Sequence, residues 1–422
     1  MSSTPGIALV ALPVALPSPL QYAVPEEWSG RLQPGHRVRV PLRGGEVFGI
    51  VTALGRPAGA PPRALRPILA VDPPVVLLES SLLELLAWVA RYYAAPLGLV
   101  MESAIPHAVA RPPRVAGAAE EGEAPPPPAA PVEDPAPPRE PTAPQAAALA
   151  RVRSALEQEQ GGIFLLQGVT GSGKTEVYLQ AAAAALARGR GALLLVPEIA
   201  VGVQLLERVR ERFGPRAVEY HSRQRPSERR ESWWRAWRGE ASIVVGARSA
   251  VFVPVRSLGL VVVDEEHEPA YKQGETPRYH GRDTALVRAR LAGAVTLLGS
   301  ATPSLESRTH AERGKYERLV LPERIGGRPA PRVTLADLRA AAPEGTEVEG
   351  VPVVGGVRDP GEPLSPYLLE RLRAARAAEN QAILLLNRRG FSTSVQCRAC
   401  GHVFECPRCS VVLTHHRAEQ AL

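Results

Sequence analysis

The sequence has few cysteines and no long apolar run. Its four cysteines all fall within thirteen residues near the C-terminus, which favours a metal site in a reducing compartment over a disulfide framework. No run of about 18 apolar residues could span a membrane. The N-terminus also lacks the charged and apolar regions of a secretory signal peptide. We therefore expect a cytoplasmic protein.

Lysine is scarce too, so almost all positive charge is carried by arginine. With 50 Lys and Arg against 43 Asp and Glu, the net charge is +7 and the pI about 9.5. This charge favours an anionic partner such as nucleic acid, although an arginine-biased composition explains it equally well. Proline is abundant, with 43 residues among 422, which predicts a linker in a chain long enough for two or three domains.

The text divides into five zones. Residues 1–108 hold short strands punctuated by proline (IALVALPVAL, HRVRVPL, EVFGIVTAL) and an amphipathic helix, SSLLELLAWVARYYAAP. Residues 109–142 form a Pro/Ala-rich linker. Residues 143–312 form the largest zone, and residues 313–380 read as an irregular basic connector. Residues 381–422 begin with one more expected strand, AILLLN, and end with the cysteines.

The zone 143–312 alternates apolar runs with helical stretches. The runs are IFLLQ, ALLLVP, AVEYHS, SIVVGA, LGLVVVDEE and AVTLLGS. Short continuous apolar runs at this spacing indicate a parallel sheet buried on both faces. The sequence therefore predicts an α/β domain. The zone also holds three tryptophans close together in sequence, and we expect their side chains to pack in the core and not to stack on bases: Trp233, Trp234 and Trp237.

A phosphate-binding loop follows the first of these runs. IFLLQ leads into GVTGSGKT and then into the helical EVYLQAAAAALARG, the strand–loop–helix context that a P-loop requires. Its glycines let backbone N–H groups close around phosphates, Lys174 reaches the β- and γ-phosphates, and the Thr175 hydroxyl binds Mg²⁺. The expected nucleotide-binding residues are Gly168, Val169, Thr170, Gly171, Ser172, Gly173, Lys174 and Thr175.

Two further motifs follow later strands and would meet the P-loop at the same sheet edge. In LVVVDEEH, Asp264 is expected to hold Mg²⁺ and Glu265 to polarise the attacking water, so that Lys174, Asp264 and Glu265 are the catalytic candidates. A lone histidine such as His267 is more often a local hydrogen-bonding residue than a catalyst. In GSATPS, the Ser300 and Thr302 hydroxyls are expected to sense the acidic motif and relay nucleotide state to a bound strand.

Together these motifs resemble the primosomal replication-restart helicase (PriA) family of superfamily 2. The resemblance is carried by GVTGSGKTEVYL, LLLVPEIA, VVGARSAVF, DEEHEPAYKQGETPRYHGRD and LLGSATPSLES, and at the N-terminus by VALPVALPSPLQYAVP, PGHRVRVPL and LAWVARYYAAPLG. NRRGF resembles the start of the family's second motor lobe. The resemblance implies a RecA-like P-loop lobe, a small β-rich domain that binds DNA 3′ ends, and an incomplete C-terminal segment of zinc module and second lobe.

The resemblance also implies an activity and partners. The family couples ATP hydrolysis to 3′→5′ movement on forked, branched or single-stranded DNA, using ATP, Mg²⁺ and Zn²⁺. Its partners are primosome and helicase-loading proteins and the single-stranded-DNA-binding protein. A second interpretation is a fork-binding scaffold that recruits the loader without unwinding, because the chain stops before the arginine fingers of the second lobe.

Individual residues acquire roles through the resemblance. AYKQGETPRYHGRD matches an aromatic-rich loop that couples DNA contact to ATP hydrolysis, and structural packing is the alternative role for its aromatic residues. Tyr271 and Tyr279 would stack on bases, and Lys272, Arg278 and Arg282 would meet phosphates. Gln145 resembles the glutamine that reads adenine, His267, Ser300 and Thr302 would couple the sites, and Arg248, Ser249 and His221 match positions lining the cleft.

The chain also departs from the family pattern. The positions of an aromatic-acid-Tyr trio that caps a DNA 3′ end read Leu20, Gln21 and Tyr22, which leaves Tyr22 as the candidate DNA contact and weakens the expectation of 3′-end selectivity. Only the Pro-rich linker occupies the interval where the family carries a winged-helix domain. In the motor lobe, EIAVGVQ departs from the family's usual EI-x-LT-x-Q, which weakens the expectation of a strand contact there.

The cysteines allow two zinc arrangements. By residue type alone, Cys397, Cys400, Cys406 and Cys409 could share one ion, although the short interval between the two pairs makes a cramped return. By the resemblance, each pair belongs to a different zinc whose other two ligands would lie beyond Leu422. We therefore expect fewer than two zinc ions per chain, loosely held.

Overall fold

The computed structural model describes residues 6–55, 65–105, 137–159, 161–197, 199–327, 329, 331–338, 345–356, 364–385 and 402–403. Most of the expected linker lies outside these residues. The chain divides into two compact units, Met1–Arg328 and Pro329–Leu422, which are described separately. No helix among the described residues is long and apolar enough to cross a membrane.

The first unit begins with a five-stranded antiparallel sheet of order β2-β1-β4-β3-β5. Its strands are β1 (Ile7–Ala11), β2 (Leu20–Ala23), β3 (His36–Leu42), β4 (Gly45–Leu54) and β5 (Ala70–Val76), with a short 3₁₀ turn, η1 (Glu26–Trp28). Two of the expected strands, β3 and β4, pair as a hairpin whose turn uses positive φ at Arg43 (51°) and Gly44 (85°). Alternating residues of these strands enclose a small core that includes Val38, Val40 and Val51.

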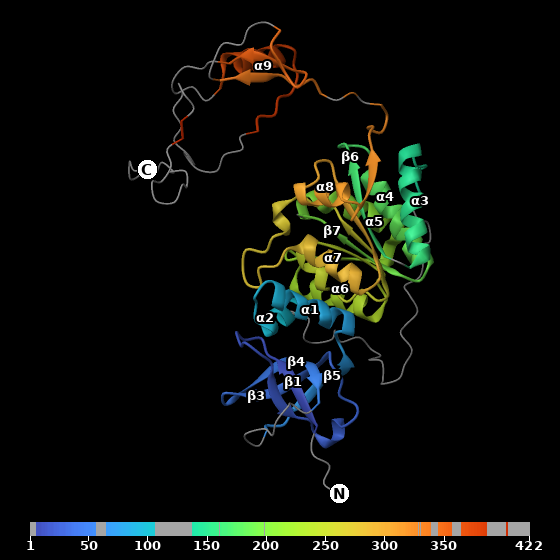
Figure 1. Cartoon of the computed structure of the whole chain (residues 1–422), viewed down its shortest axis with the longest axis vertical. Helices are drawn as coiled ribbons and strands as arrows, with labels where there is room; N and C mark the ends of the chain where they lie inside the picture. Colours follow the sequence, from blue (N-terminus) through green and yellow to red (C-terminus); the bar gives the residue numbers. More distant parts are fainter. Residues whose placement is uncertain are drawn as a thin grey trace. The chain divides into compact units, whose positions relative to one another are not determined.

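Two helices connect this sheet to the rest of the unit (Figure 1): α1 (Ser80–Tyr92), which the sequence predicted, and α2 (Leu97–Ala104). Their buried residues belong to the same apolar cluster as one face of the following sheet. The indole N–H of Trp233 donates to Ala104 O (3.0 Å), and that of Trp237 to Val76 O (3.2 Å). The packing role expected for the tryptophan cluster is therefore confirmed.

The centre of the unit is a seven-stranded parallel sheet of order β12-β6-β11-β10-β7-β9-β8. Its strands are β6 (Gly162–Gly168), β7 (Gly191–Leu195), β8 (Ala217–Tyr220), β9 (Ile243–Gly246), β10 (Leu258–Val263), β11 (Val295–Ser300) and β12 (Glu317–Leu321). The first six are the six apolar runs, so the predicted α/β fold is confirmed. The edge strand β12, which alternates buried and exposed residues, was not predicted.

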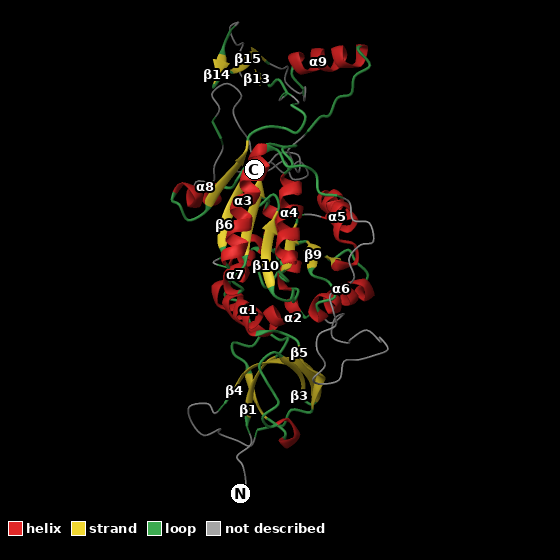
Figure 2. Cartoon of the chain, turned by 90° about the vertical axis from the view of Figure 1, so that its right-hand side faces the viewer, coloured by secondary structure: helices red, strands yellow, loops and turns green. Residues whose placement is uncertain are grey.

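Helices cover both faces of this sheet (Figure 2). One face packs against α3 (Ala143–Gln158), α4 (Lys174–Ala187) and α5 (Ile199–Phe213). The other packs against α1, α2, α6 (Pro226–Arg238), α7 (Gly281–Leu291) and the 3₁₀ turn η4 (Arg248–Phe252). Successive strand residues alternate between the two cores, which explains why the strands are apolar throughout. Three further short elements are η3 (Gly214–Arg216), η5 (Pro269–Tyr271) and α8 (Leu305–Glu312).

The second unit corrects two expectations. The stretch expected to be irregular contains a three-stranded sheet of order β13-β15-β14, made of β13 (Leu335–Asp337), β14 (Glu347–Val348) and β15 (Val351–Gly355), followed by α9 (Pro366–Ala377). Residues 382–385, the described part of the expected strand AILLLN, form no strand. Ile383 and Leu385 are 96% and 92% exposed, so this apolar stretch lacks the burial that would favour a strand.

Arg288 on α7 gives a test of this packing. Its buried guanidinium donates to Val251 O and Val253 O at the end of η4, and burial lowers the pKa of Arg288 to about 10. Arg288→Met keeps most of the side-chain volume but removes one buried donor from each carbonyl, and only Val253 O keeps another, Val255 N (2.8 Å). We therefore expect the free energy of unfolding to fall by about 2 kcal/mol. Arg290→Met, on the exposed face of the same helix, should change it by less than about 0.5 kcal/mol. Urea denaturation of both variants measures the difference, and equal losses would contradict the role of Arg288.

Candidate nucleotide and DNA site

The P-loop has the expected strand–loop–helix setting. β6 ends at Gly168 and α4 begins at Lys174, with Gly171 and Gly173 at φ values of 83° and 82° that residues with a Cβ rarely adopt. Lys174 Nζ donates to Gly168 O (3.2 Å) and lies 3.5 Å from Glu265 Oε1. The lysine is thus directed across the loop toward the acidic motif.

Asp264 follows β10 directly and is held by a neighbour that sequence reasoning missed. The hydroxyl of Tyr178 donates to Asp264 Oδ1 at 2.8 Å. Burial raises the pKa of Asp264, and the hydrogen bond from Tyr178 opposes this shift. Tyr178 lies four residues after Lys174 on α4, on the same helix face, so helical spacing was a signal that could have identified it.

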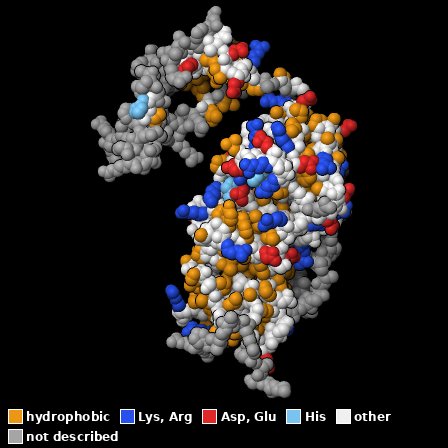
Figure 3. Space-filling view, viewed as in Figure 1, with side chains coloured by type: hydrophobic (Ala, Val, Ile, Leu, Met, Phe, Trp, Pro, Cys, Tyr) orange, Lys and Arg blue, Asp and Glu red, His pale blue; other side chains and the backbone are white. Residues whose placement is uncertain are grey.

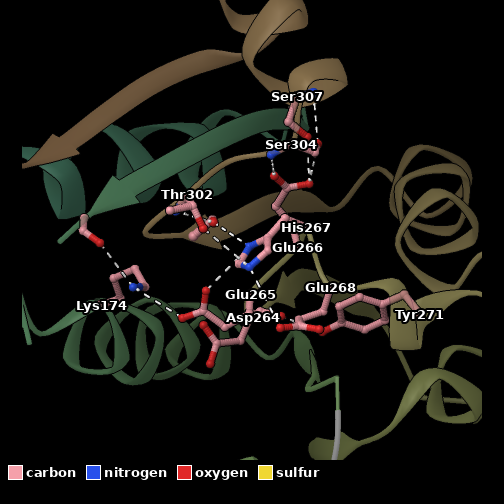
Figure 4. A network of polar contacts seen from close by, with 12 residues as sticks. Lys174, Asp264, Glu265, Glu266, His267, Glu268, Tyr271, Thr302, Ser304 and Ser307 are labelled. Atoms are coloured by element: carbon pink, nitrogen blue, oxygen red, sulfur yellow. Dashed lines mark hydrogen bonds and ion pairs between the residues drawn. The ribbon is translucent and has the colours of Figure 1, made fainter. Parts of the chain in front are cut away.

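Glu265 adopts a backbone conformation that is unusual for its residue type. Its φ of 43° lies in the left-handed region, which costs a non-glycine residue on the order of 1 kcal/mol. Hydrogen bonds on both sides hold it there: Glu266 N donates to Gly299 O (3.0 Å) and Glu268 N donates to Glu265 O (2.9 Å). The strained turn points the Glu265 carboxylate toward Lys174 (Figure 4).

The three expected coupling residues come together at this turn. Ser300 Oγ, at the end of β11, lies 2.8 Å from His267 Nδ1, and Thr302 Oγ1 lies 3.5 Å from His267 Nε2. The same imidazole lies 3.7 Å from Glu265 Oε2. His267 therefore bridges the acidic motif and the SAT motif (Figure 4). The adjacency follows from the sheet order, in which β11 lies between β6 and β10.

Glu266 is a second residue that the sequence did not single out. Its carboxylate is fully buried and accepts four hydrogen bonds. The donors are Ser304 N (2.7 Å), Ser304 Oγ (3.0 Å), Ser307 Oγ (2.8 Å) and Arg282 Nη1 (2.9 Å). Arg282 also pairs with Asp283 at 2.9 Å. The Arg282 guanidinium is thus held between a buried and a partly exposed carboxylate and is only 13% exposed, which opposes its expected phosphate contact.

The two tyrosines expected to stack on DNA bases are buried. Tyr271 is 0% exposed, and its hydroxyl lies 3.0 Å from Leu195 O and 2.6 Å from Asp264 O. Tyr279 is 3% exposed and packs edge-on against Phe252, with ring centroids 5.0 Å apart. Burial of both rings opposes stacking on bases, and the alternative packing role fits them. Burial raises the pKa of both hydroxyls, so both stay protonated.

The two other expected phosphate contacts of this loop, Lys272 and Arg278, are both exposed. One of them also bonds to the protein: Lys272 Nζ donates to Arg278 O (2.5 Å) and lies 5.0 Å from the centre of the Tyr93 ring. A backbone hydrogen bond from Gln273 N to Tyr279 O (2.9 Å) closes the loop that carries them. Arg248 Nη1 donates to Ala270 O (3.0 Å) and Lys272 O (2.9 Å), which ties η4 to the loop. By contrast, His221 lies at the end of edge strand β8, 3.2 Å from Glu219. Ser249, the other expected cleft residue, lies within η4.

Gln145 lies beside the P-loop but is largely engaged by the protein. It is 2% exposed, its Oε1 accepts from Thr142 N (2.9 Å) in a capping box, and its Nε2 donates to Ser172 O (2.8 Å). One N–H and one oxygen lone pair of the amide remain for a ligand. The amide therefore joins the start of α3 to the P-loop.

Tyr22 in the N-terminal sheet is buried, at 4% exposure, and its hydroxyl donates to Pro41 O (3.2 Å). The expected DNA contact by this ring conflicts with its burial. Leu20 and Gln21 are partly exposed beside it. A cleft of about 900 Å³ lies between this sheet and α6, and its charged lining was not marked by the sequence: Arg37, Arg39, Arg230, Glu46, Asp72 and Glu102. Arg39 lies 2.9 Å from Glu46 and Arg37 lies 3.6 Å from Asp72, so the charges in the cleft are mixed.

Charge on the surface is mixed. Figure 3 shows Lys and Arg side chains interspersed with Asp and Glu over the parallel-sheet lobe on the face in view. All four cysteines, and with them the zinc expectation, lie outside the described residues. Among the residues that are described, no three His, Cys, Asp or Glu side chains group as metal ligands.

Comparisons with known proteins agree with this geometry. Residues 9–106 match the family model of the 3′DNA-binding domain (3′BD) of PriA, and residues 142–310 match that of the DEAD/DEAH box helicases. Replication restart protein PriA of Bacillus subtilis is 42% identical over 66% of this chain and 33% of its own length. The PriA proteins of Chlamydia pneumoniae and Rickettsia felis are each 31% identical, over 96% and 99% of this chain.

This chain covers 61% of the Chlamydia protein and 59% of the Rickettsia protein, so it spans about three-fifths of the curated relatives that it matches along its whole length. The two family matches fall on the two sheets of the first unit, the antiparallel sheet with α1 and α2, and the parallel sheet with its phosphate-binding loop. The chain belongs to the PriA family of replication restart proteins.

Proposed function

We propose that this chain binds MgATP and branched DNA and starts primosome assembly at stalled replication forks in the cytoplasm. The observation that carries the proposal is the single polar network in which Lys174, the acidic motif and the SAT hydroxyls meet at one sheet edge (Figure 4). Such a convergence is what nucleotide hydrolysis coupled to a second ligand requires. By family membership, we assign ATP-driven 3′→5′ translocation to the same network.

Each residue of the network has an assigned task. The P-loop N–H groups and Lys174 bind the triphosphate, and the Thr175 hydroxyl and Asp264 hold Mg²⁺. Bound Mg²⁺ supplies neutralisation of phosphate charge. The Tyr178 hydroxyl donates a hydrogen bond to one carboxylate oxygen of Asp264, and we assign the other oxygen to the metal. The Lys174–Glu265 ion pair of 3.5 Å must open when Lys174 binds phosphate, which frees Glu265 to orient water.

The DNA contacts follow from exposure. Lys272 and Arg278, on the loop after the acidic motif, are exposed and would place positive charge against the phosphates of a DNA strand. Forked or single-stranded DNA is the proposed substrate. Helicase-loading proteins and the single-stranded-DNA-binding protein are the proposed partners, by family membership, and Zn²⁺ is the proposed ion of the cysteine pairs.

We expect Lys174→Ala to raise the dissociation constant for MgATP about tenfold or more, because the ammonium contacts the phosphates directly. Lys315→Ala is the matched control. Lys315 precedes β12, which runs parallel to β6. It therefore lies where these strands begin, whereas the P-loop lies where β6 ends, so its loss should leave ATP binding unchanged. Isothermal titration of both variants measures this, and equal affinities would contradict the assignment of the P-loop.

We expect the double variant Lys272→Ala/Arg278→Ala to weaken binding of single-stranded DNA and to flatten its salt dependence. Losing two phosphate contacts should reduce the slope of log affinity against log salt by about 1.4. Arg188→Ala/Lys315→Ala removes two exposed cations elsewhere and is the control. Fluorescence anisotropy over a range of salt concentrations gives the slopes. An unchanged slope in the loop variant would place the DNA contact elsewhere.

A second candidate function is a scaffold that binds forks and recruits the helicase loader without hydrolysing ATP. It is the second interpretation that the sequence left open. DNA-stimulated ATPase activity separates the two functions. Stimulation that disappears in Lys174→Ala supports the motor, whereas fork binding with no stimulated hydrolysis supports the scaffold for this chain.

A further inference from the structure

The segment that follows β12 lies against the P-loop. Val169 N donates to Leu321 O (3.3 Å) at the end of β12, and Ile325 N donates to Gly171 O (3.0 Å). The second contact lies within a turn, Arg324–Gly327, in which Gly327 N donates to Arg324 O (3.1 Å). Gly326 has a φ of 80°, which this kind of turn needs at its third position. The turn fixes Ile325 at its corner.

The Ile325 side chain reaches the loop beside Gln145. A Cβ placed on Gly173 would lie 2.6 Å from Ile325 Cδ1 and 2.4 Å from Gln145 Nε2, so the two side chains approach the same point from different elements. Gly173 must therefore remain glycine both for its φ and for this close packing. Ile325 still leaves 50% of its surface in water.

These two side chains have the chemistry of a base-binding site. A nucleobase presents a flat apolar face and a polar edge, and ligand sites meet such groups with an apolar wall and a few placed donors and acceptors. The Gln145 amide has one N–H and one lone pair left after its contacts with Thr142 and Ser172. Ile325 offers branched aliphatic surface whose removal from water is favourable.

We infer that Ile325 is the apolar wall against which the base of the bound nucleotide packs, with Gln145 facing the base edge. The inference rests on the proposed ATP binding and deepens it, because it assigns base recognition to the segment after β12. That segment is tied to the P-loop by backbone hydrogen bonds, so phosphate site and base wall are held as one rigid piece.

The test compares ATP with inorganic tripolyphosphate, which has the phosphates but no base. Both are titrated calorimetrically with Mg²⁺ into the full chain carrying Ile325→Asn, Ile325→Val or no substitution. We expect Ile325→Asn to weaken ATP binding about fivefold and to leave tripolyphosphate binding unchanged. Ile325→Val keeps a branched aliphatic wall and should bind ATP within about twofold of the unsubstituted chain. Val320→Asn, at a comparably exposed apolar position on β12, controls for the loss of apolar surface alone.

Unchanged ATP affinity in Ile325→Asn would overturn the inference. An equal loss of ATP and tripolyphosphate would also overturn it, because Ile325 would then support the shape of the P-loop and not contact the base. Failure of the proposed ATP binding would give a different result. The unsubstituted chain would bind neither ATP nor tripolyphosphate, or the Lys174→Ala variant would bind both as tightly as the unsubstituted chain does.

Discussion

Three neighbouring strands of the parallel sheet, β6, β11 and β10, end at the same edge, and the site depends on their register. Ser300 pairs with Gln167 and Leu298 pairs with Val263, so the P-loop, the SAT motif and the acidic motif leave the sheet within a few residues of one another. Because all three strands are buried on both faces, a slip of one residue would exchange the side chains of two separate cores. Packing therefore fixes the geometry of the polar site.

Beyond the sheet, the polar groups are positioned chiefly by one another. Glu266 is fully buried, and its donors come from α7 and from the turn that begins α8. Removing one partner from a buried carboxylate leaves an uncompensated charge, so this network resists rearrangement. The Lys174–Glu265 pair is different, since Glu265 keeps 29% of its side chain exposed and the contact is 3.5 Å long. Within the acidic motif, Glu266 is thus held rigidly, whereas its neighbour Glu265 can change its partner.

Much of this could be predicted from the sequence because it follows from local patterns. Six strands, the P-loop and the meeting of Lys174, Glu265 and His267 follow from apolar runs, from a strand–loop–helix motif and from the common edge of parallel strands. Burial of polar or aromatic residues in loops could not be predicted, because it depends on partners distant in sequence. Tyr271 is suited by type to stack on bases, yet its hydroxyl meets the backbone of β7.

The same loop nevertheless gives the proposed DNA contact a route to the nucleotide. Lys272 is exposed, but its carbonyl is held by Arg248, and the preceding residue, Tyr271, places its hydroxyl 2.6 Å from the carbonyl of Asp264. A phosphate that draws Lys272 outward therefore acts on a backbone pinned to the residue that we assign to Mg²⁺. Two arrangements of this loop with different affinities for DNA would suffice to couple the sites, since coupling needs only a differential interaction with each state. Burial of the tyrosine serves this proposed coupling, because its hydroxyl already contacts the backbone of the acidic motif.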